Sequence, residues 1–114
     1  MKRGDRERLD DIAEAVEAIQ AHAEDRNAQE RLRRDAILYN LMILGEAVKG
    51  LSDETKAKRP EIPWRQISGL RDLLAHEYYR IDMKEIEGIL RRDLVPLTAA
   101  VDALRRVKLP PAKR

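Results

Sequence analysis

Cysteine and phenylalanine are absent from this chain of 114 residues, and aromatic residues make up only 4% of it. Without cysteine the chain forms no disulfide, offers no thiol nucleophile and cannot bind zinc through thiolates. The low aromatic content disfavours a β-sandwich or a barrel. The longest apolar runs, 36–39 and 41–44, are too short to span a bilayer. Residues 1–8 also lack the apolar stretch of a signal peptide, so we expect a cytoplasmic protein.

A large excess of one charge is also missing. The chain has 23 Lys and Arg against 21 Asp and Glu, which gives a formal net charge of +2. This surplus is too small to indicate a nucleic-acid partner by itself. Charged residues nevertheless make up 39% of the sequence, which is typical of amphipathic helices with solvated outer faces. The length fits one domain, predicted to cover residues 1–114.

Apolar residues recur at steps of three and four, and no stretch alternates with a period of two, so the sequence predicts an all-α fold. Capping residues and prolines divide the pattern into helices. The predicted helices cover about 6–24 and 28–50, a short segment after Ser52, a segment from Pro63 to near Tyr79, and a long segment after Asp82. We expect an antiparallel bundle of four long helices and one short helix, with a flexible tail over about 109–114.

Two glycines in the second predicted helix have separate interpretations. The segment from Ala36 to Val48 is apolar on more than one face, which suits a central helix or one that also meets a partner. Gly45 lies inside that segment and favours the close approach of another helix. Gly50 fits the end of the helix, where a glycine can adopt the left-handed capping conformation.

Residues 69–80 combine polar groups that suit the cleavage of a phosphodiester. At about 100° per residue, Asp72 and His76 share one helix face, and Arg71 nearly eclipses Tyr78 two turns along. A guanidinium binds phosphate oxygens and offsets the charge that grows in the transition state. An imidazole exchanges protons near neutral pH. RNA supplies its own nucleophile in the ribose 2′-OH, so such a site needs neither serine nor cysteine.

The same residues have a simpler interpretation. Arg, His and Tyr are common as solvated or capping groups at the end of a helix, and a protonated histidine is stabilised there in any case. The two histidines, His22 and His76, are far apart in sequence, and neither has neighbours at metal-ligand spacing. We therefore predict no metal site.

At this segment the chain resembles the HepT-like family of the HEPN superfamily, which are small all-helical toxins. The family signature is Arg, four residues, His, one residue and Tyr, matched here by Arg71, His76 and Tyr78. The flanking segments 41–47, 62–64 and 79–82 are also similar to the family. The resemblance extends over about residues 8–107, nearly the whole chain.

The resemblance implies a metal-independent ribonuclease that works as a homodimer without a cofactor, the two motif helices meeting across a shared cleft. It implies catalytic roles for Arg71, His76 and Tyr78. It also implies a cognate antitoxin, a minimal nucleotidyltransferase that transfers AMP from ATP onto the motif tyrosine, here Tyr78. A bulky anion beside Arg71 would occupy its phosphate site and repel RNA.

Two acidic residues accompany the motif. Asp72 stands where the family most often has Asn. A carboxylate there can pair with Arg71, or it can orient His76 and favour its protonated form. Glu46 matches another family residue and is expected to orient Arg71 or to close a contact between helices.

Two other functions stay open at this point. A non-cleaving helical protein could present Tyr78 to a nucleotidyltransferase, because Asp72 could neutralise Arg71. A dimeric helical scaffold is suggested by the broad apolar surface of residues 36–48.

Overall fold

The computed structural model describes residues 4–109, and every regular element in this range is helical. The helices are α1 (Asp5–Glu24), α2 (Glu30–Gly50), α3 (Asp53–Ala57), α4 (Trp64–Glu77) and α5 (Met83–Arg105), with a single 3-10 turn, η1 (Tyr78–Arg80), after α4. For the residues that the structure describes, the prediction of an all-α fold with four long helices and one short helix is confirmed. Among the described helices, none combines the length and apolar character needed to span a bilayer.

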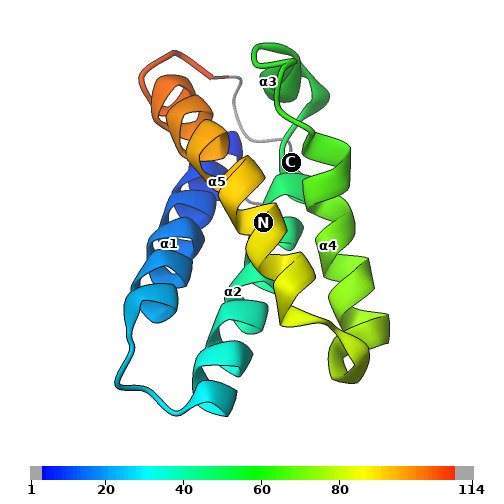
Figure 1. Cartoon of the computed structure of the whole chain (residues 1–114). Helices are drawn as coiled ribbons and strands as arrows, with labels where there is room; N and C mark the ends of the chain where they lie inside the picture. Colours follow the sequence, from blue (N-terminus) through cyan, green and yellow to red (C-terminus); the bar gives the residue numbers. More distant parts are fainter. Residues whose placement is uncertain (1–3, 110–114) are drawn as a thin grey trace.

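Helix α2 occupies the middle of the bundle. Figure 1 shows α1 and α4 on either side of it, with both running opposite to α2, while α5 crosses obliquely in front. The four long helices contribute to one hydrophobic core, because each turns a stripe of aliphatic side chains inward. Its fully buried members include Leu9, Ile12, Ile19, Leu38, Leu41, Val48, Leu74, Ile86, Leu97 and Val101.

The observed helix ends agree closely with those predicted from capping residues in the sequence. The Ser52 hydroxyl accepts a hydrogen bond from the Thr55 N–H at 3.2 Å and caps α3. The Asp82 side chain accepts one from the Lys84 N–H at 2.9 Å and caps α5. Helix α4 ends at Glu77, slightly before the predicted end near Tyr79, because the chain tightens into η1.

The two glycines of α2 both allow close packing. A Cβ added at Gly45 would lie 2.9 Å from the Arg71 backbone nitrogen, so the close approach predicted there is confirmed, with α4 as the neighbouring helix. Gly50 was expected to adopt a left-handed cap, and this is wrong, since no described glycine has a positive φ. Gly50 is instead the last residue of α2, and the Arg8 side chain lies across it.

The predicted tail over 109–114 falls mostly outside the described residues. Leu109, its first member, is half-buried and packs against the hydrophobic core.

Candidate active site

Arg71 is placed by the close packing of α4 on α2. With no side chain at Gly45, the backbone and Cβ of Arg71 lie directly against α2. The guanidinium then reaches the next residue of α2, and its Nε lies 3.1 Å from Oε2 of Glu46. The Arg71 side chain is 43% exposed, so its remaining N–H groups stay open to a ligand. This contact fits both roles predicted for Glu46, which stay predictions.

Asp72 forms the second contact of Arg71. Its Oδ1 accepts a hydrogen bond from Nη1 of Arg71 at 3.2 Å. The structure thus has the Arg71 pairing that the sequence left open for Asp72, and no hydrogen bond or ion pair joins Asp72 to His76 among residues 4–109. The Glu46 and Asp72 side chains are 52% and 60% exposed, so each ion pair contributes at most about 1 kcal/mol. Arg71 can exchange either carboxylate for a phosphate.

His76 lies one residue before the end of α4 and is exposed. Within the described range, its side chain has no hydrogen-bond or ion-pair partner. The five residues that separate it from Arg71 correspond to a rotation of about 140° around the helix axis. The guanidinium and the imidazole of one chain therefore leave α4 in different directions.

Tyr78, the third motif residue, lies in η1 and turns toward the first part of α2. Its hydroxyl donates a hydrogen bond to Oδ1 of Asp35 at 2.8 Å. Arg34 donates from Nη2 to the Tyr78 carbonyl oxygen at 2.8 Å, and its Cζ lies 5.3 Å from the centre of the Tyr78 ring. Partial burial and the hydrogen bond to the Asp35 carboxylate both raise the pKa of Tyr78, and burial has the larger effect. The hydroxyl therefore stays protonated at neutral pH.

Sequence reasoning did not find Arg34 and Asp35, although a signal for Asp35 existed. Asp35 and Glu46 are eleven residues apart, which is about three full helical turns, so they share one face of α2. Because α4 runs antiparallel to α2, this face meets Arg71 at Glu46 and Tyr78 at Asp35. The correspondence of Asp35 and Glu46 on α2 with Tyr78 and Arg71 becomes visible only once α2 and α4 are known to pack together.

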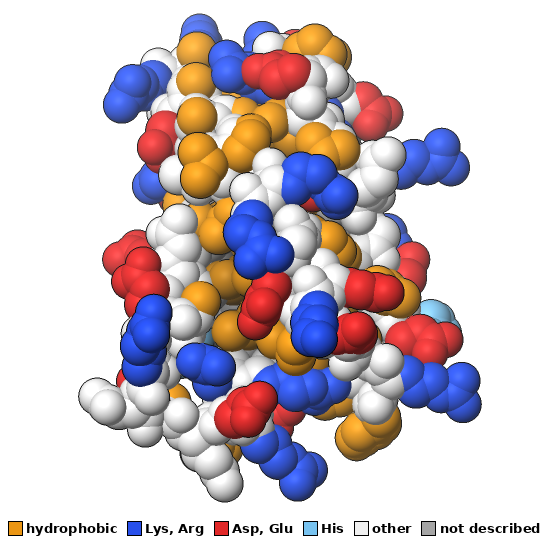
Figure 2. Space-filling model, in the orientation of Figure 1, with side chains coloured by type: hydrophobic (Ala, Val, Ile, Leu, Met, Phe, Trp, Pro, Cys, Tyr) orange, Lys and Arg blue, Asp and Glu red, His pale blue; other side chains and the backbone are white. Residues whose placement is uncertain are grey.

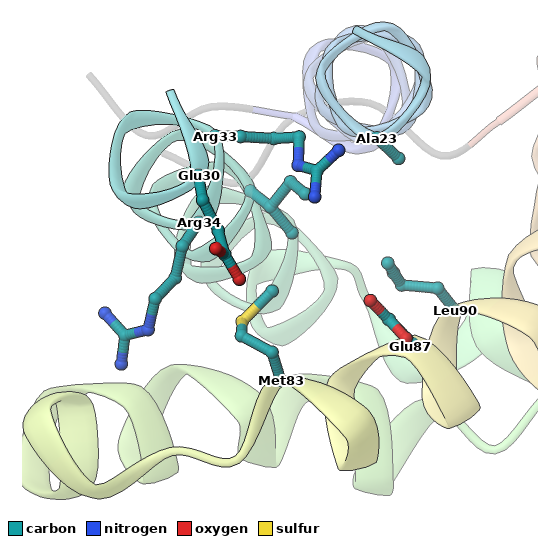
Figure 3. Close-up of a pocket in the computed structure, with 8 residues that line it drawn as sticks. Ala23, Glu30, Arg33, Arg34, Met83, Glu87 and Leu90 are labelled. Atoms are coloured by element: carbon teal, nitrogen blue, oxygen red, sulfur yellow. The ribbon is translucent and has the colours of Figure 1, made fainter. Parts of the chain in front are cut away.

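A cavity of about 170 Å³ lies between the ends of α1, α2 and α5, and Arg34 forms part of its wall. Figure 3 shows Arg33 reaching toward Ala23 at the end of α1, whereas Arg34 points away from Ala23. Glu30 and Glu87 also line this cavity, so it mixes both charges. Arg71 and His76 are not among its lining residues.

The face of the molecule in Figure 2 carries basic and acidic side chains interspersed over its lower half. Exposed apolar side chains gather mainly in the upper half of the same view. Any RNA bound on this face would meet individual cations and no continuous basic patch.

Within residues 4–109, no group of three or more His, Asp or Glu side chains is arranged to hold a metal ion.

A comparison with protein families matches residues 8–104 to the family described as Ribonuclease HepT-like. The chain belongs to the HepT-like family. All five predicted site residues lie within the matched range: Glu46, Arg71, Asp72, His76 and Tyr78. Family membership does not itself test their roles, which remain predictions.

Curated relatives of this HepT-like chain agree with the family match. "Probable ribonuclease HepT" of Thermococcus cleftensis is 33% identical over 110 residues, which cover 93% of this chain and 100% of that protein. "Putative RNase MJ1380" of Methanocaldococcus jannaschii is 29% identical over 98 residues, which cover 82% of this chain and 90% of that protein. No solved structure gives a significant match.

Proposed function

We propose that this HepT-like chain is the toxin of a toxin–antitoxin system and a metal-independent ribonuclease. The observation that carries the proposal is the state of the two central motif residues. Arg71 is held against α2 by the close packing at Gly45 and contacts Glu46, but it is only half covered, and His76 is exposed with no partner in the described range. Cleavage of RNA requires a phosphate-binding cation and a free proton-transfer group, and α4 carries both.

The proposed reaction uses the ribose as nucleophile. One histidine takes the proton of the 2′-OH, and the 2′ oxygen attacks the adjacent phosphorus. The bond from phosphorus to the 5′ oxygen breaks, and a water molecule protonates that oxygen. The products are a 2′,3′-cyclic phosphate and a 5′-hydroxyl end. Arg71 donates hydrogen bonds to the phosphate oxygens and offsets their growing charge.

A homodimer fits this reaction better than a single chain does. One chain has a single histidine in the motif, and its Arg71 and His76 diverge by about 140° around α4. A second copy across a shared cleft would bring its His76 to the Arg71 of the first copy, so that each shared site holds one arginine and one histidine. Exposed apolar side chains suit such a contact: Tyr39 and Ile43 on α2, 59% and 38% exposed, and Leu73 on α4, 43% exposed.

Silencing by a cognate nucleotidyltransferase is the regulatory part of the proposal. Tyr78 follows directly on the helix that carries Arg71 and His76, and it is partly exposed. Transfer of AMP from ATP to its hydroxyl would add a bulky anion near the path of the RNA backbone, and this anion would repel the substrate.

Replacement of His76 by alanine tests the catalytic assignment. His76 is exposed and has no partner in the described range, so H76A should fold normally. Its rate of RNA cleavage should fall at least about a hundredfold, because the proton-transfer group is removed. The measurement is cleavage of a labelled RNA together with growth arrest on expression. His22→Ala, on the other side of the bundle in α1, is the matched control and should keep full activity.

An H76A variant as active and as toxic as the parent would refute the catalytic role. The alternative of a non-cleaving binding partner is favoured by the contacts of Arg71 with both Glu46 and Asp72. Incubating the pure protein with RNA and a chelator separates the two functions. The ribonuclease cleaves under these conditions, whereas the binding partner only retains the RNA.

A further inference from the structure

Two consecutive residues of α2 hold Tyr78 at three points. Asp35 accepts the hydrogen bond from its hydroxyl at 2.8 Å. Arg34 binds its carbonyl oxygen at 2.8 Å and lies over its ring at 5.3 Å. Arg34 and Asp35 also contact each other, with 3.3 Å between Nη1 and Oδ1. No ion pair or hydrogen bond joins Tyr78 to Arg71 or His76 among residues 4–109. Its hydroxyl bonds to Asp35, while its ring also packs against the core and edge-on to Tyr79 at 5.5 Å.

The Arg34 and Asp35 hydrogen bonds with Tyr78 have different effects, because one involves its backbone and the other its side chain. The Arg34 bond to the carbonyl places a cation at the carboxyl end of α4, where it stabilises the helix end whatever the side chain of residue 78 is. The Asp35 bond depends on the tyrosine hydroxyl, which is the one atom of that side chain able to react. The Asp35 side chain is 40% exposed, so a reagent from solvent can reach the pair.

We infer that Asp35 accepts the proton of the Tyr78 hydroxyl when AMP is transferred to that residue, and that Arg34 then faces the new phosphate. This inference rests on the silencing proposed above, and it assigns the roles to residues outside the motif. Asp35 touches the reacting oxygen directly, whereas Arg34 acts as the cation that positions both Tyr78 and Asp35.

The step balances without a further reactant. The Tyr78 oxygen forms a bond to the α-phosphorus of ATP, and its proton moves to Oδ1 of Asp35. The bond from the α-phosphorus to the bridging oxygen of the β-phosphate breaks, and pyrophosphate leaves. Because the phenol is protonated at neutral pH, it needs a base in contact with it at that moment.

The Arg34–Asp35 pair also suits the product. Once Asp35 carries the proton it is neutral, so it does not repel the phosphodiester and can donate a hydrogen bond to it. The Arg34 guanidinium, already beside the ring, supplies a positive charge for the same group. A carboxylate without a neighbouring cation would oppose the modification.

Asp35→Asn is the test, because asparagine keeps the size and an acceptor oxygen but cannot take the proton. The protein and its variants are incubated with ATP, Mg²⁺ and a minimal nucleotidyltransferase of the kind proposed as the antitoxin, and intact mass follows the addition of AMP over about pH 6 to 9. We expect D35N to react at least about tenfold more slowly than the parent at neutral pH. Its rate should rise about tenfold for each unit of increasing pH, because the phenolate becomes the reacting form. Asp10→Asn, an exposed carboxylate paired with Arg105 at 3.0 Å, is the control and should behave like the parent.

The pH profile separates proton transfer from simple positioning. A D35N protein modified at the parental rate, or modified slowly with the parental pH profile, would overturn the role of Asp35 as proton acceptor. If the parent is not modified at Tyr78 at all, the proposed silencing is wrong, and the inference falls with it.

A second measurement reads the Asp35–Tyr78 contact without the transferase. In a background with Tyr39→Phe and Tyr79→Phe, ultraviolet titration follows Tyr78 alone. Asp35→Asn should lower its pKa toward the ordinary value of 10.0, because a negatively charged acceptor is lost. An unchanged midpoint would show that the hydroxyl does not rest on Asp35, which would remove the basis of the inference.

Discussion

Glycine 45 controls the position of Arg71 at the scale of single atoms. Because Gly45 has no side chain, α4 packs closely against α2. A Cβ added at Gly45 would lie 2.9 Å from the backbone nitrogen of Arg71 and 3.1 Å from the Cβ of Arg71. These neighbours are backbone and the root of a side chain, so they cannot swing aside as the end of a long side chain would. The exposed ion pairs of Arg71 add little energy, and its placement depends mainly on this packing.

Gly45→Ala should therefore lower both stability and activity. The added methyl pushes α4 away from α2, which we expect to cost about 1–3 kcal/mol of unfolding free energy, although alanine itself favours a helix. Cleavage should fall as well, because Arg71 and Glu46 separate. Urea denaturation and a cleavage assay measure the two effects.

Gly88→Ala is the matched control for that experiment. Gly88 lies within α5, and a Cβ there would meet nothing within 4 Å, so the change should stabilise the protein by up to about 1 kcal/mol. If G45A were as stable as G88A, the close approach of α4 to α2 at Gly45 would be wrong.

At the scale of elements, the start of α1 is fastened to the start of α3 through one buried carboxylate. Asp5 is 7% exposed, and it accepts hydrogen bonds from the Ser52 N–H at 2.9 Å and from the hydroxyls of Ser52 and Thr55. Burial alone would raise the pKa of Asp5, but the hydrogen bonds from Ser52 and Thr55 outweigh it, and the pKa lies below its ordinary 3.8.

Asp5→Asn should destabilise the chain by about 1–3 kcal/mol at neutral pH, because buried donors lose their charged acceptor. The folded pKa lies below the unfolded one, so this stabilisation is present above about pH 3.8 and is lost as the pH falls through the lower folded value. Urea denaturation of both proteins at neutral and acidic pH should show their difference shrinking on acidification. A difference that grew with acid would contradict the sign of this shift.

At the scale of the whole molecule, α2 contacts α1 and α4 and still leaves Tyr39 and Ile43 at the surface. A helix with core on two sides and an exposed apolar stripe on a third is suited to contact a second chain. This observation supports the dimer in the proposed function, since the divergent Arg71 and His76 of one chain would each find the complementary group on the other.

Mixing two inactive variants tests this shared site. Arg71→Ala and His76→Ala are each expected to be inactive alone. If the arginine of one copy works with the histidine of the other, a mixed dimer regains one intact site of two. Random exchange should then restore about a quarter of parental cleavage.

A mixture that stays inactive after verified subunit exchange would contradict this division of the site between copies. A protein that remains monomeric at micromolar concentration in light scattering would contradict the dimer itself.

The helices, their caps and the core followed from the sequence because each depends on neighbours within a few residues. Ser52 and Asp82 cap helices through N–H groups two or three positions ahead, and the apolar stripes repeat with the helical period. The expected left-handed cap at Gly50 is wrong, because Gly50 itself belongs to α2, and the side chain of the distant Arg8 lies against it. The predicted site residues also came from a local pattern, their spacing along one helix and its likeness to a family motif, and their roles stay predictions.

The sequence by itself determined which side chains α4 carries and in which directions they leave it, since a helix has a fixed rotation per residue. Only the tertiary structure decided what those side chains meet. Arg71 rests on Glu46 and Tyr78 on Asp35 because α2 and α4 run antiparallel in close contact at Gly45, and this pairing joins residues about 25 to 43 positions apart. Such contacts depend on how whole helices are packed, and no local pattern records that arrangement.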